Sequence, residues 1–128
     1  MKETIKSIIE WHEQTFPDAT LEGQTQKYID EKKEYQAATT VAEKNEELAD
    51  VFIVGCGIAR FDIMFAMAIF SYVNQEFAKL YGIAGKDTTL LMTSKVIFEN
   101  VISMKMEKNR QRKWSIGKGN YQHIEENK

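Results

Sequence analysis

Apolar residues recur along most of the chain at the spacing of an α-helix. In the first segment they fall at Ile5, Ile8 and Ile9, which are positions i, i+3 and i+4 of one helical face. Strand-like alternation is nearly absent, and good helix formers such as Glu, Lys, Ala, Leu and Met dominate. The pattern predicts an all-α bundle of four to five helices, over residues 2–15, 21–38, 41 to a break near Arg60–Asp62, 63–81 and 88–112.

Short polar segments separate these helices. Pro17 ends the first one, because the residue before a proline avoids the helical region. Thr40 and Glu43 have the spacing of a capping box, which marks the start of the third helix. Because the link before Thr40 is short, the second and third helices should form an antiparallel hairpin. Residues 82–87 are predicted to be a turn.

The 128 residues suggest a single domain over residues 1–114, followed by a mobile polar C-terminal tail over 115–128. The net charge of −2 gives no general attraction to nucleic acid or to an anionic membrane. Arg60 and Asp62 interrupt the apolar stretch at 51–70, which favours a buried core or subunit interface over a membrane span. A lone Cys56 among apolar residues and no visible signal peptide indicate a cytoplasmic protein.

Two acidic pairs stand out on the predicted hairpin. Glu31 and Glu34 lie three residues apart on the second helix, and Glu47 and Asp50 have the same spacing on the third. This spacing puts both members of a pair on one helical face, about one turn apart. If the two pairs face each other, four carboxylates converge. Such a cluster suits a hard cation, Mg²⁺ or alternatively Mn²⁺.

A solvated acidic surface is an equally simple interpretation of the spacing alone, because runs of charge usually face water. The neighbouring residues favour the metal. Each pair adjoins apolar residues at helical period, and a carboxylate at the edge of a core is costly without a partner or an ion. These apolar neighbours are Tyr28, Tyr35, Leu48, Val51, Phe52 and Val54.

A polar column follows on the last helix. Lys105, Asn109 and Arg112 have spacing i, i+4 and i+7 and therefore share a face. A basic helix end that offsets the helix dipole would look the same. Combined with a metal-binding cluster, the column fits a triphosphate, whose phosphate oxygens Lys and Arg would neutralise. No glycine-rich phosphate loop and no nucleophile–base pair is present, so a metal-activated water attacking phosphorus is the natural reaction.

Taken together these motifs resemble the MazG-like all-α nucleoside triphosphate pyrophosphohydrolases, and the compact, phage-type members in particular. The resemblance covers about residues 1–61 and 95–123. It is carried by the acidic motifs at 30–34 and 46–51 and by the column Lys105-x-x-x-Asn109-x-x-Arg112-x-Trp114. The Trp11–Phe16 segment and a tail histidine, His123, add weaker matches.

The resemblance implies hydrolysis of a nucleoside triphosphate between its α- and β-phosphates, giving a monophosphate and pyrophosphate. Glu31, Glu34, Glu47 and Asp50 would bind Mg²⁺ and form the catalytic centre, and the Lys105, Asn109 and Arg112 side chains would contact phosphates. Trp11 or Trp114 would stack on the base, although a core or tail-anchoring role suits each equally well. The resemblance also implies a homodimer or homotetramer that completes the bundle.

Three further expectations follow from the residues. The apolar stretch at 63–91 exceeds the needs of one small bundle and should form part of a subunit interface through Met64, Phe65, Met67, Phe70 and Phe77. His12 is most simply a residue at the boundary of the core. A di-iron site is rejected, because neither His12 nor His123 has a glutamate three residues before it. The alternative function is a non-catalytic helical binding protein that acts through its apolar surface.

Overall fold

The computed structural model describes residues 3–80, 88–117 and 120–124, with side chains over 3–80 and 95–112. Within this part of the chain there are five helices, as the sequence predicted, and each boundary lies within three residues of its expected place. The turn expected at 82–87 lies outside the described residues. The elements are α1 (Ile5–Thr15), α2 (Leu21–Ala37), α3 (Val41–Ile58), α4 (Ile63–Leu80), α5 (Thr88–Gln111), β1 (Lys113–Gly117) and β2 (Asn120–Ile124).

A threonine caps the start of each of the first three helices. Thr4, Thr20 and Thr40 accept hydrogen bonds from backbone N–H groups of the first turn, which would otherwise lack partners. The bond from Glu43 N to Thr40 Oγ1 is 3.1 Å long and confirms the predicted start of α3. Thr4 also explains why α1 begins at Ile5 rather than at residue 2, since the cap itself is extended.

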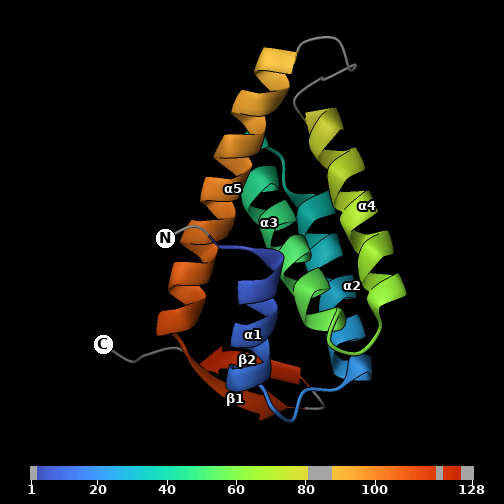
Figure 1. Cartoon of the computed structure of the whole chain (residues 1–128), viewed down its shortest axis with the longest axis vertical. Coiled ribbons are helices and arrows are strands. Elements are labelled where there is room, and N and C mark those ends of the chain that lie inside the picture. Colours follow the sequence, from blue (N-terminus) through green and yellow to red (C-terminus); the bar gives the residue numbers. More distant parts are fainter. Residues whose placement is uncertain (1–2, 81–87, 118–119, 125–128) are drawn as a thin grey trace.

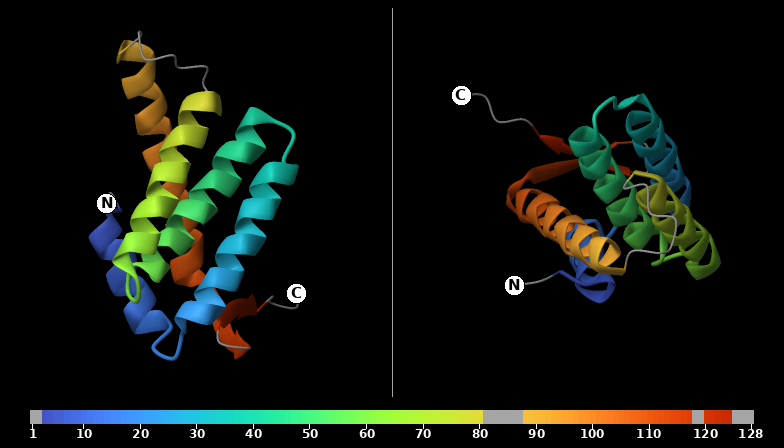
Figure 2. Two further views of the ribbon diagram at one scale, coloured as in Figure 1. Left: turned by 90° about the vertical axis from the view of Figure 1, so that its right-hand side faces the viewer. Right: turned by 90° about the horizontal axis from the view of Figure 1, so that it is seen from above.

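α3 lies at the centre of the bundle and contacts α1, α2, α4 and α5 (Figure 1). α2 and α3 run antiparallel and are joined by a short link, as the hairpin prediction required (Figure 2). α4 returns antiparallel to α3, and α5 then runs in the same direction as α3 (Figure 1). The central position explains why α3 is buried on most of its faces.

Two apolar faces of α3 belong to separate core clusters. Ala49, Ile53 and Cys56 pack with α1 and α5, at the i, i+4 and i+7 spacing of one face. Leu48 and Ile58 belong to the face that packs against α4 and Tyr35 of α2. Cys56 is buried, as predicted, and burial raises the pKa of its thiol to about 12. The acidic pair of α3 lies on a third face, toward α2.

The C-terminal segment is not the irregular tail that the sequence suggested. β1 and β2 form an antiparallel two-stranded sheet in which Trp114 pairs with His123 and Ile116 with Tyr121. The sequence contains residues that are common in hairpin turns, Gly117 and Asn120, but the polar residues around them weaken the alternation that indicates strands. β2 contacts α2, and the sheet lies at the end of the bundle where α2 begins and α5 ends (Figure 1).

α4 carries three of the large exposed apolar side chains among the described residues. Ile63, Met64 and Met67 face outward, and Met64 is 72 % exposed. The interface expectation was wrong for Phe77, which is buried and packs against Phe98 with ring centroids 5.4 Å apart. Phe65 and Phe70 are half-buried against the core that α3 and α4 share. Among the described residues no helix is both long and apolar enough to cross a membrane.

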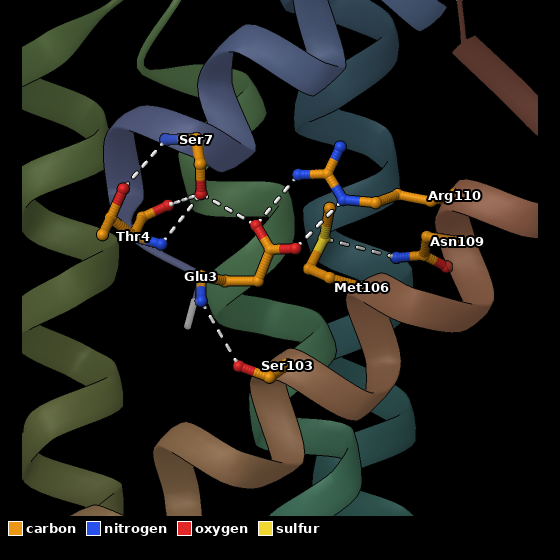
Figure 3. A network of polar contacts seen from close by, with 7 residues as sticks. All are labelled: Glu3, Thr4, Ser7, Ser103, Met106, Asn109 and Arg110. Carbon is orange, nitrogen blue, oxygen red and sulfur yellow. Dashed lines mark hydrogen bonds and ion pairs between the residues drawn. The ribbon is translucent and has the colours of Figure 1, made fainter. Parts of the chain in front are cut away.

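A polar network fastens the N-terminal segment to α5 (Figure 3). Arg110 donates two hydrogen bonds to the carboxylate of Glu3, at 3.0 and 2.9 Å, and Ser7 Oγ donates a third at 2.8 Å. The Glu3 N–H donates to Ser103 Oγ, which lies about two turns before Arg110 on α5. The guanidinium of Arg110 keeps the pKa of Glu3 below its ordinary value. This bidentate pair holds the C-terminal half of α5 against the segment that precedes α1.

His12 is a core residue, so the expectation of a boundary position was wrong. Its side chain is buried, and its Nδ1 lies 2.7 Å from NH1 of Arg60. The same NH1 donates to the carbonyl oxygens of His12 and Phe16, at 3.3 and 2.9 Å. Arg60 therefore supplies donors to the C-terminal end of α1, whose last carbonyls have no partner within the helix. Burial and the nearby Arg60 charge lower the pKa of His12 to about 4.

Candidate metal and phosphate site

Three of the four predicted carboxylates converge where α2 and α3 face each other. Glu31 and Glu34 of α2 and Glu47 of α3 each place one carboxylate oxygen within 4.8 Å of the others. The i, i+3 spacing on α2 aligns the first two, and the antiparallel hairpin brings the third opposite them. The convergence expected from the sequence is thus present for three of the four carboxylates and not for Asp50, while the role of these groups as ligands stays a prediction.

Two oxygens of this cluster are buried without a hydrogen-bond partner among the described residues. They are Oε2 of Glu31 and Oε2 of Glu47. A buried acceptor that lacks a donor costs about 1–3 kcal/mol, and more when it is charged. A cluster with two such oxygens is destabilising by itself, so the fold tolerates it only with a compensating proton or cation.

The pKa values of the cluster reflect this unfavourable burial. Burial, followed by the charge of Asp50, raises the pKa of Glu31 to about 8. The same two causes raise the pKa of Glu47 to about 7. Burial also raises the pKa of Asp50, against the opposing effect of the Lys105 ammonium. Near neutral pH the cluster therefore holds protons that ordinary surface carboxylates would have lost.

Asp50, the fourth predicted ligand, is bound to a lysine. Lys105 Nζ of α5 donates to Asp50 Oδ2 at 3.2 Å, and both side chains are about three-quarters buried, with 23 % and 25 % exposed. Asp50 is one turn beyond Glu47 on the same face of α3, so Lys105 reaches the edge of the carboxylate cluster. The structure thus joins the predicted acidic motif to the first residue of the predicted polar column.

The other two residues of the column continue along α5 away from the cluster. Arg112 NH1 donates to Asn109 Oδ1 at 3.3 Å, and Asn109 Nδ2 donates to the sulfur of Met106 at 3.8 Å. Asn109 and Arg112 lie toward the hairpin end of the bundle, because α5 runs in that direction (Figure 1).

The two tryptophans proposed for base stacking lie in different parts of the fold. Trp11 is buried in the core formed by α1, α3 and α5, and its ring meets Phe16 edge-on with centroids 5.1 Å apart. This position corresponds to the core alternative rather than to an exposed stacking surface. The side chains of Trp114 and His123 lie outside the described residues, although their backbones pair in the hairpin.

Lys27 belongs to this region and was not predicted. Its Nζ lies 3.9 Å from Glu31 Oε1, one turn away on α2. Lys27 also opposes the rise in pKa that burial causes in Glu31 and Asp50. The sequence contains a signal for it, because lysine four residues before glutamate is a common helical ion pair. That signal is too frequent on helices to single out a site.

The donor set fits a hard divalent cation. All three convergent groups offer carboxylate oxygens, which Mg²⁺ and Mn²⁺ prefer, and no sulfur or imidazole lies among them. The buried oxygens without partners provide the independent structural sign, since a cation would satisfy both. Mg²⁺ commonly binds through a few carboxylates and keeps several waters, so three such groups are enough to hold it.

Comparisons with known proteins identify no relative of this chain. No family model, no curated protein and no solved structure matches it.

Proposed function

We propose that this chain is a Mg²⁺-dependent nucleoside triphosphate pyrophosphohydrolase. The observation that carries the proposal is the cluster of Glu31, Glu34 and Glu47, with two buried oxygens that lack donors. A lysine beside the cluster, Lys105, adds a cation that can contact an anionic ligand. Metal-ligating carboxylates next to basic residues are the arrangement that phosphoryl chemistry needs. The resemblance of the motifs to the MazG-like enzymes points to the same activity.

Each group has a defined task in this proposal. Glu31, Glu34 and Glu47 would hold the ion, and Asp50 would either join them or keep Lys105 in place. The ion, when bound, supplies polarisation of phosphate oxygens and activation of water. Lys105, Asn109 and Arg112 would bind the phosphates through charged and amide donors. The i, i+4 and i+7 spacing of these residues at the C-terminal end of α5 suits a chain of phosphates that extends from the carboxylate cluster toward the hairpin.

The reaction is a substitution at the α-phosphorus. The oxygen of water forms a bond to this phosphorus while the bond to the oxygen that bridges to the β-phosphorus breaks. Pyrophosphate leaves with the electron pair of that bond, and the products are a nucleoside monophosphate and pyrophosphate. The proton that water loses passes to a carboxylate of the cluster.

The test is a nucleotide panel. Purified full-length protein with Mg²⁺ is expected to release pyrophosphate from at least one standard or modified deoxynucleoside triphosphate. Chromatography of the products should show the monophosphate rather than the diphosphate. EDTA should abolish the activity, because it removes the divalent cation that the reaction requires. Added Mn²⁺ should restore the activity, because carboxylate ligands accept this ion as well as Mg²⁺. If no nucleotide in a broad panel is cleaved with either metal, the enzyme proposal is wrong.

We also propose that the exposed face of α4 pairs with a second copy of the chain. No charged residue occurs from Ile63 to Gln75, so two copies of this face can meet without like-charge repulsion. Light scattering after size exclusion should show a dimer or tetramer. Met64→Glu combined with Met67→Glu should yield monomers, whereas Val41→Glu, at another exposed apolar residue, should not. A wild-type protein that is purely monomeric would rule the pairing out.

The same exposed face supports the alternative function, a non-catalytic binding protein. In that case the apolar residues of α4 would recognise a different partner, and the carboxylates would have no task. The two functions differ in their metal dependence. A binding protein would keep its partner affinity in EDTA and after Glu47→Ala, whereas pyrophosphate release depends on both.

A further inference from the structure

Lys27 is the second lysine at the carboxylate cluster, and its surroundings differ from those of an ordinary surface pair. Its side chain is 31 % exposed and that of its partner Glu31 only 16 %. The Lys6–Glu10 pair of α1 has the same spacing and the same distance of 3.9 Å, but its side chains are 88 % and 54 % exposed. Lys27 is therefore partly withdrawn from water beside the buried carboxylates, whereas Lys6 is not.

The ammonium of Lys27 keeps its hydrogen-bonding capacity. Its distance of 3.9 Å from Glu31 Oε1 exceeds the length of a hydrogen bond. Glu31 is the ion-pair partner of Lys27 among the described residues, and no hydrogen bond of the Lys27 ammonium is found in this part of the chain. Lys105, in contrast, donates directly to Asp50 at 3.2 Å. A lysine ammonium has three donors, so Lys27 can bind oxygens of a ligand without breaking a bond in the protein.

The direction of the helices places Lys27 on the correct side of the cluster. α2 begins at the hairpin end, so Lys27 lies about 6 Å from Glu31 along the helix axis toward that end. α5 ends there, so Asn109 and Arg112 lie on the same side of Lys105 (Figure 1). A phosphate chain that leaves the carboxylates in this direction would run along α3, which contacts both α2 and α5.

We propose that Lys27 is a phosphate-binding residue of the same site, facing the column on α5 from the opposite side. This inference rests on the proposed function and adds a residue from α2 to its substrate contacts. In the free protein Lys27 and Lys105 offset the charge of the carboxylates. When a divalent cation takes over that task, both lysines are released to contact phosphate oxygens. Metal binding thereby makes Lys27 available to bind the pyrophosphate half of the substrate.

The test uses inorganic pyrophosphate as a probe, with calorimetry as a readout that needs no turnover. In the presence of Mg²⁺, Lys27→Gln should weaken pyrophosphate binding at least about tenfold, because a charged hydrogen-bond donor is lost. Lys27→Arg should restore most of the affinity. Without pyrophosphate, Lys27→Gln should bind Mn²⁺ as tightly as the wild type or more tightly, since a competing cation has gone.

Lys6→Gln is the matched control, because it removes a helical pair of equal spacing and distance but far from the site. It should leave both affinities unchanged. If Lys27→Gln binds pyrophosphate as the wild type does, Lys27 is only a helix-stabilising residue and the inference fails while the enzyme proposal stands. If the wild type binds neither Mn²⁺ nor pyrophosphate, both proposals fail together.

Discussion

Glu31→Gln is expected to inactivate the protein and at the same time to stabilise it in the absence of metal. The substitution removes one of the three convergent carboxylates and so weakens the binding of the ion. The bound ion would stabilise the transition state of the reaction by several kcal/mol. Pyrophosphate release with Mg²⁺ should fall by about a thousandfold or more, which corresponds to about 4 kcal/mol. An initial-rate assay at saturating nucleotide measures this effect.

The gain in stability follows from the ionisation of the cluster. Because burial raises the pKa of Glu31 from its ordinary value of 4.5 to about 8, the folded protein holds a proton that the unfolded chain has lost between these two pH values. Stability therefore decreases as the pH rises from about 4.5 to 8, and the effect of Glu47 has the same sign up to about pH 7. A neutral glutamine does not ionise. In EDTA at pH 8, Glu31→Gln should raise the free energy of unfolding by about 1–3 kcal/mol.

Urea unfolding in EDTA at several pH values between 5 and 8 provides the measurement. The wild type should lose stability over this range, and Glu31→Gln should show a shallower dependence. Glu46→Gln is the matched control, since Glu46 is exposed on the same helix and outside the cluster. A Glu31→Gln protein that is less stable than the wild type at pH 8 would contradict the account of strained carboxylates. An active Glu31→Gln protein would contradict the role of Glu31 as a ligand.

The helices were predictable from local signals, and so was the convergence of three of the four carboxylates. The helix cap at Thr40 and the proline at position 17 each act on residues close to them in the sequence. The periodicity of the apolar residues is visible in the sequence itself. The short link after α2 leaves an antiparallel hairpin as the simple arrangement. Given that hairpin, the i, i+3 spacing places Glu31, Glu34 and Glu47 together.

What could not be predicted depends on contacts between distant segments. The distinction between Asp50 and the other carboxylates comes from Lys105, which is 55 residues further along the chain. The burial of His12 depends on Arg60 across the bundle, and the sequence around either residue gives no sign of the pair. The hairpin after Lys113 has short strands with mixed polarity, so the alternation that would reveal it is weak.

Gly57→Ala is expected to destabilise the fold, although alanine is the better helix former. In an exposed helix this exchange stabilises by about 1 kcal/mol. In α3 the added Cβ would lie 2.7 Å from Nε2 and 2.9 Å from Cδ2 of His12, and 3.0 Å from Oε1 of Gln24. The imidazole cannot easily withdraw, because Arg60 lies 2.7 Å from its Nδ1 and the Phe16 ring packs against it at 5.0 Å. Overpacking of this kind should cost about 1–3 kcal/mol net in chemical denaturation.

A double-mutant cycle tests the cause of this loss. If the clash with the imidazole is responsible, Gly57→Ala should cost much less in a His12→Ala background, where the ring is absent. Equal costs in both backgrounds, or a stabilised Gly57→Ala single variant, would contradict the packing described here.

The contact between Gly57 and Gln24 also affects the metal site, because Gln24 precedes Lys27 and Glu31 on α2. Pushing α2 away from α3 separates Glu31 from Glu47, so the affinity of Gly57→Ala for Mn²⁺ should fall together with its stability.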